Sequence, residues 1–133
     1  MSDAALDVAR RGFALWSAGD VDEFLELGTS DFEFIPAIAA SVEGGSIKGR
    51  NEFRRFFADL NETWETFRIS VEDFQEIRGC VMTIGRLTAK GRGSELELDH
   101  PFYSVLWFRG DRIARMQSFL DESAARAAVE ESA

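Results

Sequence analysis

Four long segments of alternating character, joined by short glycine turns, dominate the second half of this 133-residue chain. Apolar residues at every second position predict strands with one buried face. Turns this short join antiparallel neighbours, so the pattern predicts an antiparallel meander. The expected strands are Phe67–Ile77, Cys80–Lys90, Glu95–Arg109 and Arg112–Leu120, separated by the turns Arg78-Gly79, Gly91-Arg92-Gly93 and Gly110-Asp111.

Three amphipathic helices are expected before this meander. Apolar residues at spacings of three and four predict the first helix, which Gly19 ends. Asp20 and Glu23 have the spacing of a capping box and predict a short second helix. Asn51 is expected to cap a third helix with apolar residues crowded on one side. The apolar faces are Leu6, Ala9, Phe13 and Trp16 in the first helix and Phe53, Phe56, Phe57, Leu60 and Trp64 in the third.

The remaining segments complete one α+β domain that spans residues 1–133. Asp31–Pro36 alternates and then stops at proline, which predicts a short strand. Ala37–Gly45 shows no period, and we expect an irregular segment beside a pocket mouth. Residues 121–133 are rich in Ala and Glu and predict a loosely held C-terminal helix. Three helices packed on the concave face of a curved, mostly antiparallel sheet would leave a cavity between the layers.

Composition excludes several classes of function. The net charge of −9 and the pI near 4.6 oppose nucleic-acid binding, which needs clustered Lys and Arg. The 29% charged content and the lack of a signal-peptide pattern predict a protein outside the membrane, and the single cysteine, Cys80, fits the reducing cytoplasm. One His and one Cys cannot supply a typical metal site, so we expect no metal and no cofactor.

His100 is the leading candidate for chemistry. In the strand Glu95–Arg109 it shares a face with Leu98, Phe102 and Ser104, and this face is expected to point inward. Desolvation there would lower the pKa of the imidazole and leave a neutral ring that exchanges protons. The alternative is a core histidine whose hydrogen bonds are satisfied by the backbone or water.

The other candidates surround the same expected cavity. Ser104 and Ser118 are expected to orient one polar ligand atom, although both also fit as ordinary strand serines. Asp121 would assist His100 as a carboxylate at the rim, or else cap the terminal helix. Met116 shares the face of Ser118. The aromatic residues of a ligand wall, or of a plain core, are Trp16, Phe34, Phe57 and Trp64.

Several motifs resemble the SnoaL-like branch of the nuclear transport factor 2-like superfamily, which includes ketosteroid isomerase and polyketide cyclases. The resemblance covers nearly the whole chain. The motifs are Ser17-Ala18-Gly19-Asp20-Val21-Asp22, Thr29-Ser30-Asp31-Phe32-Glu33-Phe34, Ile47-Lys48-Gly49-Arg50-Asn51-Glu52-Phe53, Trp107-Phe108-Arg109-Gly110-Asp111-Arg112-Ile113 and Phe119-Leu120-Asp121. The resemblance implies a cone-shaped, cystatin-like fold and a homodimer formed through the outer sheet face at Tyr103, Val105 and Trp107.

The resemblance also implies a function. The ketosteroid isomerase residues fall near Gly12, Ile35 or Pro36, and Ser104 and are missing, whereas His100 and Asp121 loosely match residues of the cyclases. We therefore expect cofactor-independent binding or proton-transfer conversion of a small apolar carbonyl compound, by an isomerase, cyclase or dehydratase type of reaction. The alternative is a non-catalytic ligand-binding or protein-interaction module of the same fold.

Overall fold

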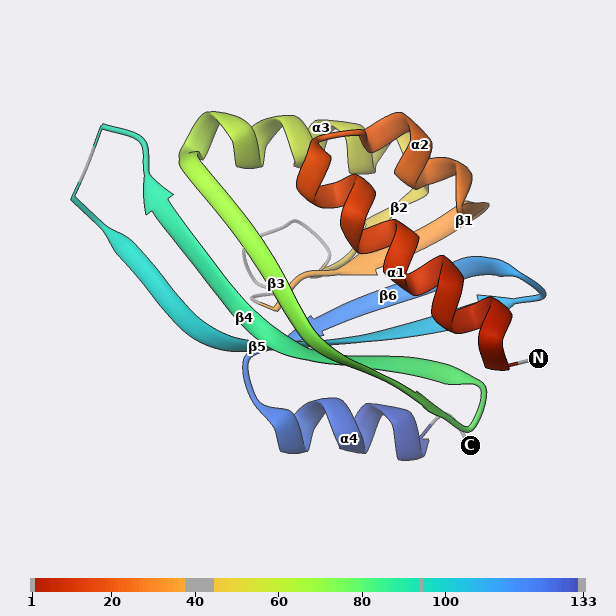
Figure 1. Ribbon diagram of the computed structural model, residues 1–133. Helices are drawn as coiled ribbons and strands as arrows, with labels where there is room; N and C mark the ends of the chain where they lie inside the picture. Colours follow the sequence, from red (N-terminus) through yellow and green to blue (C-terminus); the bar gives the residue numbers. More distant parts are fainter. Residues whose placement is uncertain (1, 38–44, 94, 132–133) are drawn as a thin grey trace.

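The computed structural model describes residues 2–37, 45–93 and 95–131, and it places helices on both faces of one curved sheet (Figure 1). None of the described helices is long and apolar enough to cross a membrane. The helices are α1 (Ser2–Ala18), α2 (Val21–Glu26), α3 (Gly49–Thr63) and α4 (Glu122–Glu131). The strands are β1 (Gly28–Ile35), β2 (Ile47–Lys48), β3 (Trp64–Ile77), β4 (Cys80–Gly91), β5 (Glu97–Arg109) and β6 (Arg112–Phe119).

The sheet has six strands in the order β2-β1-β6-β5-β4-β3. The predicted antiparallel meander is confirmed for β3 to β6. The exception in the sheet is the parallel pair of β1 and β6, in which Phe34 lies opposite Met116. This pairing brings the first half of the chain beside the last strand, and the α+β class is confirmed.

Several boundaries differ from the prediction. The strand expected from Asp31 begins at Gly28, where it pairs with Ile113, and the strand expected from Phe67 begins at Trp64. The strand expected from Glu95 begins at Glu97. Most of the irregular segment expected over residues 37–45 lies outside the described residues.

The predicted helix caps were wrong in detail. α3 begins at Gly49, because the backbone N–H of Lys48 donates to the Glu52 carboxylate at 3.2 Å and stabilises an earlier start. Asn51 instead accepts a hydrogen bond from Arg54. Asp20 stands at the N-cap of α2 but makes no capping hydrogen bond with its side chain, so the capping box is absent.

Helices α1 to α3 cover the inner face of the sheet, and α4 lies on the outer face (Figure 1). The inner core is aromatic and is centred on the fully buried Phe53. The outer core is smaller: Ala125 and Val129 of α4 pack on Val105 and its neighbours Cys80 and Met82. The expectation of a loosely held C-terminal helix is therefore wrong, because two small apolar residues four positions apart seat α4 on the sheet.

α4 covers part of the outer sheet face through which a homodimer was expected. Val105 is fully buried and packs in the cluster that α4 completes, while Tyr103 and Trp107 are half-buried beside it. The Arg115 guanidinium stacks over the Trp107 ring at 4.8 Å. Any homodimer formed through the outer face would use α4 itself or the part of the sheet that α4 leaves uncovered.

The strands β3 and β4 bend where a glycine permits close contact. Val71 pairs with Gly85 and Asp73 with Ile84, so Glu72 is an extra residue and forms a bulge. A Cβ on Gly85 would overlap the carbonyl oxygen of Ser70. The bend, and with it the curvature of the sheet around the inner core, therefore requires glycine at this position.

We expect Gly85→Ala to destabilise the protein by at least about 2 kcal/mol, because the backbone of β3 must move to admit the methyl group. Gly12→Ala is the matched control, since a Cβ there meets only side chains at 3.5 Å or more and α1 gains helix propensity. Urea unfolding of the two variants measures the difference. Equal stability of both would show that the bend does not depend on Gly85.

Candidate functional site

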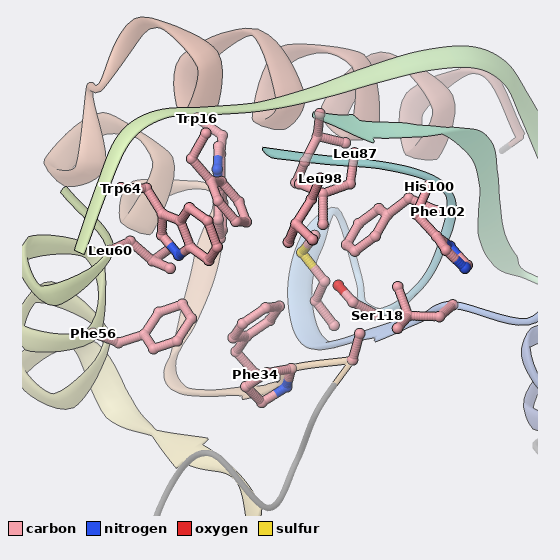
Figure 2. Close-up of a pocket in the computed structure, with 16 residues that line it drawn as sticks. Trp16, Phe34, Phe56, Leu60, Trp64, Leu87, Leu98, His100, Phe102 and Ser118 are labelled. Carbon is pink, nitrogen blue, oxygen red and sulfur yellow. The ribbon is translucent and has the colours of Figure 1, made fainter. Parts of the chain in front are cut away.

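A cavity of about 380 Å³ lies between the inner helices and the sheet. Trp16, Trp64 and Phe56 lie at one end of it, and His100 and Ser118 lie at the other (Figure 2). The lining contains no Asp, Glu, Lys or Arg side chain among the described residues. Burying a charge in such surroundings is costly, so the cavity suits a neutral, mainly apolar occupant.

Six of the nine predicted site residues line this cavity: Trp16, Phe34, Trp64, His100, Met116 and Ser118. Sequence reasoning missed further lining residues, most of them apolar neighbours on the same faces. Periodicity could have identified some of them, because they lie one helical turn or one strand repeat away from a predicted residue. The missed residues are Pro36, Ala37, Phe56, Leu60, Phe67, Ile69, Leu87, Leu98, Phe102 and Leu120.

Ser118 supplies the buried hydroxyl of the cavity. It is 3% exposed and lies directly opposite Ser104, with 3.5 Å between the two Oγ atoms. Ser104 is fully buried and does not line the cavity. On its other side it pairs with the buried Thr83 of β4. When Ser104 donates to Ser118, the Ser118 hydroxyl keeps its own proton for a ligand oxygen. The two predicted serines therefore lie together, and Ser118 is the one that lines the cavity.

His100 lies at the rim of the cavity, and its side chain is exposed rather than buried. The expected desolvation of the ring is wrong, because β5 extends beyond the cover of the helices at this end. Leu98, two residues away on the same face, is 38% exposed for the same reason. The predicted direction of the face still holds, since His100 and Phe102 both border the cavity.

A backbone contact fixes the chemistry of this imidazole. His100 Nδ1 lies 2.7 Å from the carbonyl oxygen of Pro101. Because a carbonyl oxygen only accepts, Nδ1 must carry the proton of this hydrogen bond. In the neutral ring Nε2 is then the unprotonated nitrogen, which can accept a proton.

Asp121 has the structural role that was its alternative. Its carboxylate accepts hydrogen bonds from the Ser123 hydroxyl and from the Ala124 backbone N–H at 3.0 Å, and so caps α4. The hydrogen bonds from Ser123 and then Ala124 lower the pKa of Asp121 below its ordinary value. Asp121 is not among the residues that line the cavity.

Phe57, the remaining predicted residue, packs against Trp16 with ring centroids 5.5 Å apart. It faces a smaller pocket rather than the main cavity. Within the described residues, no group of three or more His, Cys, Asp or Glu side chains could hold a metal ion. Side-chain chemistry in the described lining therefore comes from the Ser118 hydroxyl, the His100 imidazole and the indole N–H groups of Trp16 and Trp64.

Arg92 fixes the end of α3 that borders the cavity. Its guanidinium donates to the carbonyl oxygens of Asn61 at 2.8 Å and Glu62 at 3.2 Å, and its backbone N–H donates to the carbonyl of Thr63 at 3.2 Å. These bonds satisfy carbonyl groups that a helix end leaves free. The turn after β4 thus holds the helix that carries Leu60 beside Trp64.

Comparison with known proteins identifies the family that this architecture matches. A family model described as a SnoaL-like domain matches residues 9–116. No curated protein matches the sequence. The match covers α1 from Ala9 onward and extends into β6 as far as Met116, so it includes most of the elements that surround the cavity.

Solved structures of low sequence identity share the fold. A nuclear transport factor 2-like protein of unknown function from Burkholderia pseudomallei is 15% identical with a TM-score of 0.79, covering 95% of this chain and 97% of that one. TerC, co-crystallised with polyporic acid, is 17% identical with a TM-score of 0.77, covering 96% and 98%. A candidate SnoaL-like polyketide cyclase from Jannaschia sp. is 20% identical with a TM-score of 0.75, covering 96% and 92%.

The cap at Asp121 predicts a pH-dependent stability. Because the folded-state pKa is lowered, the carboxylate stabilises the fold fully above the unfolded pKa, and this contribution is lost as pH falls through the folded value. We expect Asp121→Ala to lower the melting temperature near neutral pH. The two melting temperatures should converge only as the pH falls from about 4 through the lowered folded-state pKa. Glu130→Ala, on the same helix, is the control and should change little at either pH. A gap that stays constant down to acid pH would contradict the capping role.

Proposed function

The chain belongs to the SnoaL-like family, and from this premise we propose that its cavity binds a small, neutral, apolar carbonyl compound and converts it by proton transfer without a cofactor. The observation that supports this most is the lining of the cavity of about 380 Å³: its described residues include no charged side chain, and they place one buried hydroxyl and one imidazole at the same end. TerC, similar in fold, was crystallised with polyporic acid, which agrees with an organic occupant.

The proposed roles follow from position. The apolar body of the ligand packs against Trp16 and Trp64, which gives affinity by removing apolar surface from water. The Ser118 hydroxyl donates to the carbonyl oxygen. His100, with Nδ1 bound to Pro101, uses Nε2 to take a proton next to that carbonyl and to return it. An isomerase, cyclase or dehydratase type of reaction needs these steps.

Binding is tested first. Trp16 and Trp64 line the cavity while Trp107 lies on the outer face, so Trp107→Phe leaves fluorescence that reports on the cavity. We expect a panel of small aromatic and polyketide-like carbonyl compounds to contain members that quench this signal saturably. Ser118→Ala should weaken their binding by about fivefold, or about 1 kcal/mol, through the lost hydrogen bond. Absence of saturable quenching across the panel would contradict the proposal.

Turnover is tested separately with two variants of His100. Asn retains an N–H close to the position of Nδ1, and Gln places an amide close to the position of Nε2, but neither amide exchanges protons as an imidazole does. For a compound that the wild type converts, we expect both variants to lower kcat by about 100-fold or more while affinity changes little. Unchanged kcat in His100→Asn would remove His100 from the mechanism.

The non-catalytic alternative has one observation in its favour. Asp121 caps α4, so the second titratable group expected at the site is engaged elsewhere. Compounds that bind with Ser118-dependent affinity but are recovered unchanged after long incubation would support a ligand-binding module in place of an enzyme.

A further inference from the structure

A second, smaller pocket of about 160 Å³ adjoins the main cavity. Three residues, Trp16, Leu60 and Phe67, line both spaces and therefore form the wall between them. The smaller pocket lies where the ends of α1 and α3 meet the start of β3. It is thus at the end of the main cavity that is opposite Ser118 and His100 (Figure 2).

The two spaces differ in chemistry. Beyond the shared wall, the smaller pocket is lined by Phe57 and by the exposed residues Ser17, Ala18, Gly19 and Asn61, at the ends of α1 and α3. Arg92 donates a hydrogen bond to the backbone carbonyl of Asn61 and not to its side-chain amide. Hydroxyl, amide and peptide groups can each bond a ligand oxygen or hydroxyl, whereas the main cavity is mostly apolar.

Trp16 supplies a second observation. Its side chain is almost fully buried, with the residue 6% exposed, and its indole N–H has no hydrogen bond within the described residues. The buried side-chain polar atoms that lack a partner among the described residues are Thr29 Oγ1 and Arg50 Nε. The Trp16 N–H is not one of them, so this donor keeps some accessible surface and is open to a hydrogen-bond acceptor. The indole nitrogen lies on the side of the ring turned away from Phe34 (Figure 2). An accessible donor without an acceptor among the described residues thus belongs to a residue of the wall between the two spaces.

We propose that the smaller pocket is a second ligand subsite, which binds an oxygen at the end farther from Ser118 of a ligand whose apolar body fills the main cavity. The inference rests on the proposed function, because the carbonyl end of the same ligand lies at Ser118. Its ligand class is narrower: a neutral, elongated compound with an apolar middle and an oxygen at each end. The ligand passes the wall when the half-buried Leu60 side chain changes rotamer.

Two matched series of ligands test this subsite by calorimetry on the full chain. The first series is straight-chain 2-ketones of increasing length, and the second is the same ketones with a hydroxyl on the far end. At one chain length we expect the hydroxyketone to bind about 5- to 10-fold more tightly than the plain ketone, since its hydroxyl oxygen accepts from Trp16.

Two variants test whether the tighter binding of the hydroxyketone depends on the smaller pocket. Trp16→Phe removes the N–H and Asn61→Ala removes the amide, and each should bring the affinity ratio toward one. The ratio cancels any general loss of packing, which affects both series alike. Asn51→Ala, at the other end of α3, is the matched control and should keep the full ratio.

The outcomes separate the two proposals. Plain ketones that bind with no gain from the hydroxyl at any length would overturn the second subsite and leave the proposed function standing. A gain that persists in both Trp16→Phe and Asn61→Ala would also overturn it. Failure of both series to bind would overturn the subsite, and together with an absence of saturable quenching by the aromatic and polyketide-like panel it would overturn the proposed function as well.

Discussion

The packing of Phe53 against four aromatic rings is the interaction on which the cavity depends. Trp16, Phe24, Phe32 and Phe34 surround it with ring centroids between 5.4 and 5.7 Å away. These rings come from α1, α2 and β1, so one residue of α3 ties three other elements together. Loss of such a ring costs about 3–5 kcal/mol. Trp16 and Phe34 also line the cavity, so part of its wall is packed as closely as the core behind it.

The periodic spacing of apolar residues in the sequence was enough to predict much of this arrangement. Alternation along β5 placed Phe102, Ser104 and Leu106 on the inner face and Val105 on the outer face, and all four are buried as a result. The spacing of apolar residues cannot show, however, where the helices stop covering the sheet. His100 follows the same alternation but lies where β5 extends past the helices, so its direction was predictable and its exposure was not. The position of α4 could not be predicted from spacing either, because its packing on the outer face of the sheet depends on residues distant in sequence.

Capping errors have a local cause of a different kind. Asp20 and Asn51 are good cap residues by type, yet α2 has no capping bond from the Asp20 side chain, and α3 begins before Asn51 through a bond from Lys48 to Glu52. Several side chains near a helix start compete for the same free N–H groups, and tertiary packing decides among them. Asp121 shows the converse: a residue typical of caps proved to be one, at the position where the family resemblance had suggested chemistry.

The distribution of polar groups limits which conversion can be proposed for the cavity. Enzymes that catalyse proton transfer commonly use separate groups as proton donor and acceptor, but among the described lining residues the titratable side chain is His100. A single imidazole, with Nδ1 bound to Pro101, can take a proton at Nε2 and return it elsewhere on the same molecule. The Ser118 hydroxyl stabilises a developing oxyanion less than a charged group would. The proposed chemistry is therefore favoured for substrates whose C–H bond is already acidified by an adjacent carbonyl, and within the proposed reaction types it favours isomerisation.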